Sequence, residues 1–231
     1  VLLRDGTSYV TRLTTPFFIN GLVRLHLHSR GAISHLFVEP LPPLRPLGDA
    51  ELSLRVRAVG LNFRDVLNVL GEYPGDPGPP GGDAAGVIAA SPAQPSFGHA
   101  YAPLASVAVS AALFLARKPA TLSFEQTCTL PTTWSTTHAA VERAGLRAGC
   151  WMIVQAAAGG VGLKAVEYAQ WLSTAVVGTA GRPYKQALLR AIGANVLCSS
   201  RDGAAFGAGA ARLFAATRAH AVLNSLSLDF I

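Results

Sequence analysis

The chain has 231 residues, of which 50% are hydrophobic and 14% are charged, and its formal net charge is +6 at pH 7. So much apolar material can bury a core, which excludes a disordered chain, and the length allows one large domain or two ordinary ones. The cysteines Cys128, Cys150 and Cys198 are far apart and odd in number. This pattern argues against a disulfide framework and a Cys-x-x-Cys metal site. It favours a reducing, intracellular setting without distinguishing the cytoplasm from a plastid.

The positive charge comes from scattered arginines rather than from a dense basic block. No basic face with interleaved aromatic residues is visible, so no nucleic-acid partner is expected. The charge indicates either an ordinary solvated surface or attraction to phosphates or to an acidic partner protein. The longest apolar run, Val107–Ala116, is too short to span a bilayer, so no membrane association is expected. The chain does not begin with Met and has no leader pattern, which we interpret as a segment of a longer polypeptide.

The first part of the chain predicts a β-rich domain. Residues 1–20 show no period and are expected to form a linker or tail. Apolar and polar residues alternate over 22–31 and again over 50–62, which is the pattern of half-buried strands. A proline-rich connection over 41–49 separates these two segments.

Short helices and a long loop follow the strands. The segment 63–71 predicts a helix that ends at Gly71, and 73–86 is so rich in proline and glycine that only backbone turns are expected. Further on, Ser123 has the features of a helix N-cap, with Pro131 interrupting the helix that it begins.

From Gly149 onward, predicted strands and helices alternate, and the domain boundary is expected between Ala140 and Gly149. Alternation of this kind builds a parallel sheet with right-handed crossovers, so the predicted fold class is α/β. The predicted strands are WMIVQA, AVVGTA, NVLCSS and AVLNSL, and the predicted helices are VGLKAVEYAQWL, PYKQALLRAIG and a segment near AARLFAATR.

Small residues occupy the turn between the first strand and the first helix of this alternating part. The pattern is Ala156-x-x-Gly159-x-x-Gly162, with Gly160 and Val161 between the two glycines. Small residues permit a tight turn, close approach of a pyrophosphate and close helix–strand packing, and the helix N–H groups and dipole then face the anion. The strand before the turn and the helix after it favour a dinucleotide site. The alternative is a tight turn that binds no ligand.

Cationic and hydroxyl residues follow the second and third predicted strands. No acid follows Thr179, where an acidic residue would bind the free 2′-hydroxyl of an adenosine ribose. Arg182 and Lys185 stand there instead, and Ser200 and Arg201 follow the third strand. These groups suit a 2′-phosphate, so the sequence predicts NADPH rather than NADH. The alternative is a set of solvated surface cations.

A long specific stretch, RAVGLNFRDVLNVLGEYPGDPGPPGGDAAGVI, occurs together with AAAGGVG, GTAGRPYK, SSRD and VLNSL. In these motifs, from Leu22 to the C-terminus, the chain resembles the enoyl reductase domains of modular (type I) polyketide synthases. These are zinc-independent, quinone oxidoreductase-like members of the medium-chain dehydrogenase/reductase superfamily. The resemblance implies an incomplete GroES-like, β-rich substrate domain over 21–140. A Rossmann-type, doubly wound parallel sheet over 141–231 follows, truncated at its C-terminus.

The same resemblance implies NADPH-dependent hydride transfer to the β-carbon of a trans-2-enoyl thioester, which gives the saturated acyl chain. The implied partners are an acyl carrier protein, which presents the enoyl chain on its phosphopantetheine arm, and the neighbouring synthase domains. The oligomeric state would be set by the parent synthase.

Positions that bind zinc in related metal-dependent enzymes carry other residues here. Asn62 and Phe63 replace a thiolate, and Gly82 replaces the imidazole of a Gly-His-Glu motif. His26 and His28 share one face of a strand but make at best a two-ligand set, so no metal site is expected. A conjugated enoyl thioester needs less help than a ketone, because hydrogen-bond donors can stabilise the enolate oxygen.

The resemblance also implies which side chains act on the substrate. Tyr73 matches a tyrosine that can protonate the α-carbon and set methyl-branch stereochemistry; the alternative is an aromatic ring that packs the loop. Lys185 matches a second candidate donor. A residue after the second strand lies near the adenosine ribose, however, so a contact to the 2′-phosphate is physically simpler. The aspartate that accompanies this lysine in the family is not matched over 203–205, and only Asp202 is close.

Further cofactor contacts follow from the same resemblance. Asn62 is shared with quinone oxidoreductases and is expected at the cofactor. Thr136 matches a threonine that faces the nicotinamide from the helix leading into the second domain. Asn224, Ser225 and Leu226 match a segment that borders the nicotinamide ribose. The alternative for each is ordinary polarity at a helix or strand end.

Two departures from the family pattern keep other interpretations open. The connection between Val87 and Phe97 is shorter than in the family, so a strand is expected to be missing or rebuilt. The chain also stops at NSLSLDFI, before the remaining Rossmann strands and the return segment. We therefore expect either a fragment of a longer protein or a domain that is inactive by itself. A free-standing NADPH quinone oxidoreductase and a non-catalytic structural module are the alternative functions.

Overall fold

The computed structural model describes residues 2–4, 7–9, 21–89 and 93–225. The first elements are β1 (Leu2–Arg4), β2 (Thr7–Tyr9), β3 (Val23–Leu27), η1 (Ile33–His35), β4 (Leu36–Pro40), β5 (Glu51–Gly60), α1 (Phe63–Leu70), β6 (Asp83–Ile88), β7 (Gln94–His99), β8 (Val107–Ala111), η2 (Ala112–Phe114), β9 (Leu115–Arg117) and α2 (Phe124–Thr127). The remaining elements are α3 (Pro131–Ala144), β10 (Trp151–Val154), α4 (Gly160–Trp171), β11 (Ala175–Thr179), α5 (Pro183–Ala191), β12 (Val196–Cys198), α6 (Gly203–Leu213) and β13 (Ala221–Leu223).

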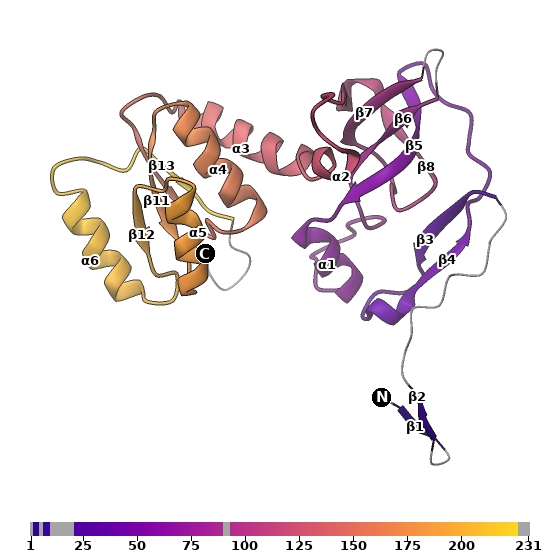
Figure 1. Ribbon diagram of the computed structural model, residues 1–231, viewed down its shortest axis with the longest axis horizontal. Coiled ribbons are helices and arrows are strands. Elements are labelled where there is room, and N and C mark those ends of the chain that lie inside the picture. Colours follow the sequence, from indigo (N-terminus) through magenta and orange to yellow (C-terminus); the bar gives the residue numbers. More distant parts are fainter. Residues whose placement is uncertain (1, 5–6, 10–20, 90–92, 226–231) are drawn as a thin grey trace.

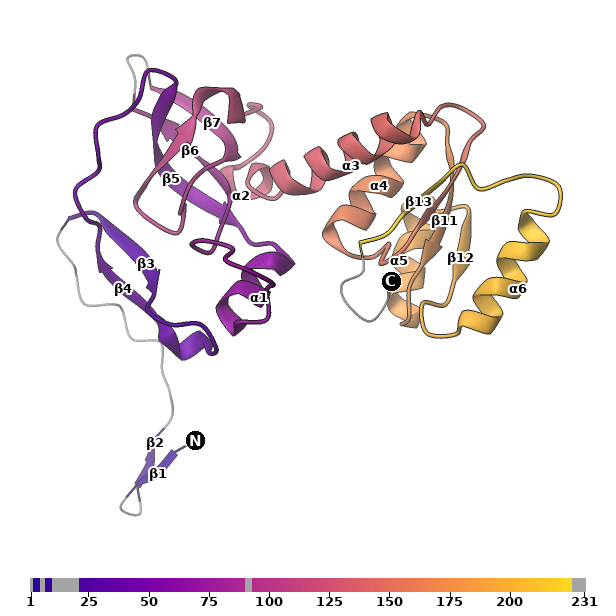
Figure 2. The same ribbon diagram turned by 180° about the vertical axis from the view of Figure 1, so that it is seen from behind.

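These elements form an antiparallel half and a parallel half, which the helix α3 joins (Figures 1 and 2). The antiparallel half contains a five-stranded sheet in the order β8-β5-β6-β7-β9 and the two-stranded sheet β3-β4. The parallel half contains a four-stranded sheet in the order β12-β11-β10-β13. The described part of the predicted tail over 1–20 holds β1 and β2, which pair as a short antiparallel hairpin.

The alternating segments of the sequence form strands of the antiparallel half, as predicted. The segment over 22–31 gives β3, and the segment over 50–62 gives β5, whose register shifts between Val56 and Ala58. Leu54 is fully buried in the core of the large sheet, while Arg55 and its alternate neighbour at 57 are exposed. The helix predicted over 63–71 is also confirmed, since α1 ends at Gly71 in the left-handed conformation (φ 76°).

The prediction that residues 73–86 form only backbone turns is wrong at its C-terminal end. Asp83–Ile88 is strand β6 inside the sheet, paired with β5 on one edge and with β7 on the other. Its first four residues are buried, and a Cβ at Gly86 would lie 2.1 Å from the carbonyl oxygen of Arg55. Small residues are required for this close contact, and they hide the strand from a pattern built on large apolar residues.

The shortened connection after β6 does not remove a strand. β7 pairs with β6 along six residue pairs and with β9 along its other edge. At Gly98 the backbone has φ 156°, and a Cβ would lie 1.9 Å from the carbonyl oxygen of Phe114, so only glycine fits. The strand expected to be missing or rebuilt is therefore present, and its pairing places His99 directly opposite Asp83.

Two helices lead from the antiparallel half toward the parallel one. The predicted cap is confirmed: the hydroxyl of Ser123 accepts the N–H of Gln126 at 3.1 Å, and the side chain of Gln126 accepts the N–H of Ser123 at 2.9 Å. Pro131 is the first residue of α3 rather than an interruption within one helix. Its missing N–H costs nothing there, because that donor has no partner inside a helix.

The predicted alternation of strands and helices in the second part is confirmed, and the α/β fold class with it. β10 lies between β11 and β13, and α4 packs on this sheet. The buried core of this half includes Met152, Val154, Val166, Val176 and Leu189. The carboxyl ends of the parallel strands meet at one edge of the sheet, which is where turns and helix N-termini gather.

Candidate functional site

The glycine turn lies between β10 and α4. Ala156 has a positive φ of 48°, and Gly159 is the N-cap residue of α4. A Cβ at Gly162 would lie 2.5 Å from the Cα and the carbonyl oxygen of Ala157, so this position admits no side chain. Gly159 and Gly160 are exposed. The first turn of a 12-residue helix is therefore accessible to an anion, which its N–H groups and dipole favour.

Helix α3 packs against this turn through two buried threonines. A Cβ at Gly160 would lie 3.1 Å from Cγ2 of Thr133. The hydroxyl of Thr137 donates to the carbonyl of Thr133 at 2.8 Å and lies 3.4 Å from the carbonyl of Val161. Thr136, which the sequence assigns to the cofactor, is exposed between them. Helix α3 thus packs on the turn through Thr133 and Thr137 and leaves Thr136 accessible.

The loops after β11 and β12 meet at a glycine. Thr179 is buried at the end of β11, and its carbonyl accepts the N–H of Ala157 at 3.1 Å. A Cβ at Gly181 would lie 2.8 Å from Nε of Arg201 and 3.0 Å from Oγ of Ser200, so both side chains lie over this glycine. The structure therefore brings together the two predicted phosphate-binding segments beside the glycine turn.

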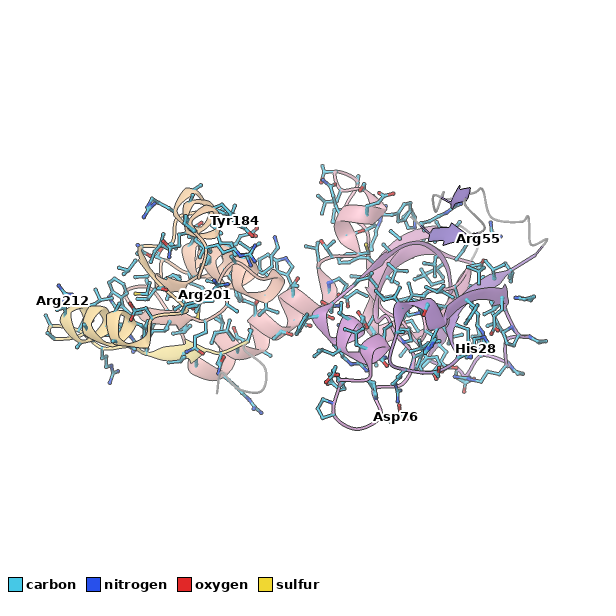
Figure 3. All side chains as sticks on the ribbon, turned by 90° about the horizontal axis from the view of Figure 1, so that it is seen from below. His28, Arg55, Asp76, Tyr184, Arg201 and Arg212 are labelled. Atoms are coloured by element: carbon cyan, nitrogen blue, oxygen red, sulfur yellow. The ribbon has the colours of Figure 1, made fainter. Side chains whose placement is uncertain are left out.

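Two further cations stand at the start of α5. Arg182 is its N-cap residue and lies 3.4 Å from the hydroxyl of Tyr184, and Lys185 is half-buried in its first turn. Figure 3 labels Tyr184 and Arg201 on this half of the molecule. Among the described residues, no ion pair involves Arg182, Lys185 or Arg201. The carboxylate of Asp202 accepts a backbone N–H at 2.8 Å and caps α6, so the nearest acid is already engaged.

The last described residues follow β13. Asn224 and Ser225 are exposed and come directly after Leu223, which pairs with Val154 at the end of β10. They therefore lie at the same sheet edge as the glycine turn. Leu226, the third residue assigned to this segment, falls outside the described residues.

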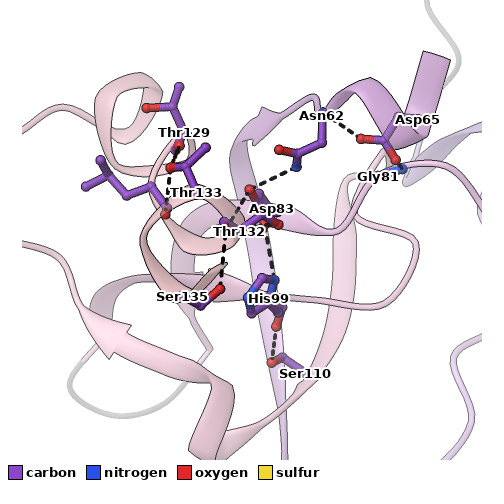
Figure 4. Close-up of polar contacts among 11 residues, drawn as sticks. Asn62, Asp65, Gly81, Asp83, His99, Ser110, Thr129, Thr132, Thr133 and Ser135 are labelled. Atoms are coloured by element: carbon purple, nitrogen blue, oxygen red, sulfur yellow. Dashed lines mark hydrogen bonds and ion pairs between the residues drawn. The ribbon is translucent and has the colours of Figure 1, made fainter. Parts of the chain in front are cut away.

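A buried carboxylate, Asp83, is the centre of polar contacts in the antiparallel half (Figure 4). Its side chain is 1% exposed. It accepts a hydrogen bond from Nδ2 of Asn62 at 3.0 Å and from the hydroxyl of Thr132 at 2.7 Å, and the N–H of Thr132 lies 3.1 and 3.2 Å from its two oxygens. Nδ1 of His99 lies 3.1 Å from Oδ1. Groups from α1, α3 and β7 thus meet at one carboxylate.

These contacts keep Asp83 ionised. Burial raises the pKa of Asp83, but the hydrogen bonds from His99, Thr132 and Asn62 act in the opposite direction and leave that pKa below its ordinary value. The negative charge sits at the N-terminus of α3, where the helix dipole also favours it. On the neighbouring helix α2, burial and then the charge of Asp83 raise the pKa of the Cys128 thiol.

Asn62, a predicted cofactor residue, is held from two sides. As the N-cap residue of α1 it forms a capping box with Asp65, whose carboxylate accepts the N–H of Asn62 at 2.8 Å. The other oxygen of Asp65 accepts the N–H of Gly81 at 2.8 Å. With its side-chain amide on Asp83, Asn62 has a fixed position at the entry to α1.

Tyr73, the predicted proton donor, is half-buried in a loop that arginines fix. The guanidinium of Arg64 lies 5.6 Å from the centre of the Tyr73 ring and donates to a loop carbonyl. Asn68, 1% exposed, donates to the carbonyl of Gly78 at 3.0 Å and accepts from Arg30 at 3.0 Å. The ring of Tyr73 therefore has Arg64 over one face, beside a loop that Arg64 and Asn68 hold in place.

A cavity of about 1410 Å³ opens in the antiparallel half. Its wall includes residues of β3, β8 and the loop over 76–82, which contains Gly81, together with Arg64 and His99. The imidazole of His99 is 40% exposed, so one edge of the ring meets the cavity while Nδ1 meets Asp83.

Sequence reasoning missed His99, Thr132 and Arg64. No local motif marks the first two, because Asp83 meets His99 only through strand pairing, and Thr132 is 49 residues away along the chain. The available signal was weak: a hydroxyl residue after Pro131 at a helix start, and an acid at the start of an unrecognised strand.

The structure also bears on metal ligands. In the parts of the chain described here, no group of three or more His, Cys, Asp or Glu side chains is arranged to hold a metal ion. His26 and His28 lie 3.8 and 3.6 Å from the carboxylate of Glu39 instead. Over the same residues, no helix has both the length and the apolar character needed to cross a membrane.

No protein-family model matches the sequence. Among curated proteins, the chain is 38% identical, over an alignment of 249 residues, to the spectinabilin polyketide synthase system protein NorB of Streptomyces orinoci. This match covers 99% of the chain but 11% of NorB, so the chain spans a small part of the length of that relative.

Two solved structures share the fold. The CurK enoyl reductase is 30% identical with a TM-score of 0.82, and the match covers 91% of this chain and 69% of that one. The quinone oxidoreductase from Thermus thermophilus, solved also in complex with NADPH, is 31% identical with a TM-score of 0.65. That match covers 84% of this chain and 62% of that one. Similarity in sequence and in fold thus extends over both halves of the molecule.

Proposed function

Because this chain belongs to the enoyl reductases of polyketide synthases, within the medium-chain dehydrogenase/reductase superfamily, we propose that it reduces the double bond of a trans-2-enoyl thioester with NADPH. The product is the saturated acyl thioester. The proposed partners are an acyl carrier protein, which delivers the substrate on its phosphopantetheine arm, and the neighbouring synthase domains.

The observation that carries the cofactor proposal is the meeting of an open glycine turn with three cations that lack ion pairs among the described residues. Gly159, Gly160, Val161 and Gly162 are the proposed pyrophosphate contacts, because a Cβ at Gly162 would lie 2.5 Å from Ala157 and the exposed Gly159 and Gly160 leave helix N–H groups accessible. The groups that would hold a 2′-phosphate are Arg182, Lys185, Ser200 and Arg201. When bound, NADPH supplies the hydride that the substrate receives at its β-carbon.

The nicotinamide end is proposed to reach toward the antiparallel half. Asn62, Thr136, Asn224, Ser225 and Leu226 are the proposed contacts there. The fixed position of Asn62 and the exposure of Thr136 support this assignment. For Lys185 we favour a contact to the 2′-phosphate over proton donation, because it begins the helix after the second parallel strand.

The residues of this chain must then stabilise the enolate and protonate its α-carbon. Tyr73 is the proposed donor, and the guanidinium of Arg64 over its ring supports this role. This contact limits the positions that the ring can take. The alternative, that Tyr73 only packs the loop, predicts no change in product when its hydroxyl is removed.

Substrate choice tests this function directly. The full-length protein that contains these residues should oxidise NADPH with crotonyl-pantetheine and ignore a benzoquinone. Turnover of the quinone without turnover of the thioester would instead identify a quinone oxidoreductase. No turnover, together with no nucleotide binding, would identify a structural module.

Tyr73→Phe tests the donor within the same assay. We expect a lower rate or altered stereochemistry at the α-carbon of a methyl-branched product, because only the hydroxyl is lost. An unchanged product at full rate would remove Tyr73 from the mechanism. The matched control is Tyr168→Phe, whose hydroxyl lies 2.9 Å from Nδ1 of His138, outside the proposed site.

A further inference from the structure

We propose that His99, oriented by Asp83, donates a hydrogen bond from Nε2 to the thioester carbonyl oxygen and stabilises the enolate that forms there. This inference rests on the proposed function. It adds a side chain that touches the reacting carbonyl, while Tyr73 acts at the α-carbon.

The position of the imidazole is the first observation that supports this role. Nδ1 lies 3.1 Å from Oδ1 of Asp83, which fixes the plane of the ring. The ring is 40% exposed and lines the cavity of about 1410 Å³. The ring also packs edge-to-face on Phe114, with ring centres 6.4 Å apart. The Nε2 edge is therefore the polar part of His99 that can meet a ligand in this cavity.

The second observation is the location of Asp83 between the two sides of the proposed site. The same carboxylate that holds His99 accepts the amide of Asn62 at 3.0 Å, and Asn62 is a proposed contact of the nicotinamide end. Asp83 also accepts both donors of Thr132, at the start of the helix that packs on the glycine turn. One buried anion thus connects the cavity wall to the cofactor side through direct hydrogen bonds.

The charge of the pair determines which form of His99 can act. Asp83 is ionised, so Nδ1 must carry a proton to donate to it. A neutral ring would then have an unprotonated Nε2, which can only accept. Only the imidazolium can donate from Nε2 to an oxyanion. The proposed donor is therefore the doubly protonated ring of His99.

The cavity wall also carries other titratable groups, which the test must separate from His99. The acids are paired: Glu51 with Arg45, and Asp76 with Arg30, whose N···O distance is 2.7 Å. Hydrogen bonds from Arg45 and the backbone lower the pKa of Glu51 to about 2, and a backbone hydrogen bond and Arg30 lower the pKa of Asp76. The wall also carries His26 and His28 from β3, Tyr101, and the arginines Arg24 and Arg64. Histidines are the groups that typically titrate between about pH 5 and 8.

The first test is the pH profile of kcat/KM with crotonyl-pantetheine and NADPH in the full-length protein. In the wild type we expect activity to fall as pH rises, because a ring that loses its Nε2 proton can no longer donate to the enolate. His99→Gln keeps a neutral N–H for Asp83 or the carbonyl, so it should lose about 10- to 100-fold at low pH and show no such fall. His99→Phe should lose about 100-fold or more. The matched control is His35→Gln, whose imidazole contacts Ser29 and does not line the cavity, and which should keep the wild-type profile.

The second test needs no cofactor. Diethyl pyrocarbonate modifies accessible imidazoles, and peptide mass mapping separates His99 from His26 and His28. Butyryl-pantetheine, a saturated product analogue, should protect His99 at least tenfold more than His28. Thermal melts of each variant separate loss of fold from loss of chemistry, and His99→Gln is the variant expected to stay folded.

The two proposals fail in different ways. If the wild type turns over the thioester but His99→Gln keeps both its rate and its pH dependence, the role of His99 is overturned and the reductase function stands. Absence of protection by butyryl-pantetheine also overturns it. If the wild type does not turn over the thioester, the proposed function fails, and with it the role of His99 in that reaction.

Discussion

The parallel and antiparallel halves prepare their sites by opposite means. In the parallel half the site is made of backbone: glycines remove side chains from the turn before α4, and N–H groups remain accessible. In the antiparallel half it is made of side chains: Asn62, Thr132 and His99 converge on the buried carboxylate of Asp83. The difference implies that adding atoms damages the glycine turn, whereas removing atoms damages the network around Asp83.

The largest expected effect is therefore that of Asp83→Ala. It leaves the donors of Asn62, Thr132 and His99 without their buried acceptor, which should cost about 3–5 kcal/mol of unfolding free energy. Urea unfolding at neutral pH measures this loss. Asp76→Ala is the control, because its carboxylate is 81% exposed and its pair with Arg30 is screened by solvent. Equal, small effects of both variants would contradict a structural role for the network.

The pH dependence of stability in a second variant at this position, Asp83→Asn, sharpens the comparison. The pKa of Asp83 is lower in the folded protein than the unfolded value of ~3.9, so its charge stabilises the fold above that pH. The stabilisation is lost as pH falls from ~3.9 through the folded pKa. The difference in unfolding free energy between wild type and Asp83→Asn should therefore narrow on acidification below pH ~4. A difference that widens there would mean that Asp83 is neutral in the fold.

A smaller loss is expected when one atom is added to the parallel half. The Cβ of Gly162→Ala would lie 2.5 Å from Ala157, so α4 must move away from the turn, at about 1–3 kcal/mol. A thermal melt and an NADPH titration should both register the shift. Gly207→Ala in α6 is the matched control, because its Cβ would meet nothing within 4 Å. That change should be neutral or stabilising, since alanine favours a helix. If Gly162→Ala also binds NADPH at full affinity, the turn does not require glycine.

The smallest of these effects concerns one cation. Arg201→Ala should weaken NADPH binding about tenfold and leave NADH binding unchanged, because a charged hydrogen bond to the 2′-phosphate is lost. Arg212→Ala is the control: this arginine is exposed on α6 (Figure 3) and bonds a carbonyl of its own helix at 3.3 Å. Equal losses of affinity for NADPH and NADH would show that Arg201 does not contact the 2′-phosphate.

Most of the parallel half could be predicted from the sequence because its signals are local. The turn glycines, the missing acid after Thr179 and the cations that follow are neighbours along the chain. Their meeting over Gly181 follows from the parallel order of β11 and β12.

The antiparallel half was predicted less completely because its site depends on pairing. β6 was mistaken for a loop, since Ala84, Ala85 and Gly86 give no apolar alternation. Without that strand, nothing in the sequence places Asp83 opposite His99 or beside Thr132. Local sequence patterns do not determine which residues of two strands pair or which distant residues come into contact.

The most direct test of the central claim is a comparison of the dissociation constants of NADPH and NADH for the wild-type full-length protein, measured by fluorescence titration. With a 2′-phosphate held by Arg182, Lys185 and Arg201, NADPH should bind at least tenfold more tightly, and the advantage should shrink as salt is added. Equal affinities, or no binding of either nucleotide, would contradict the account.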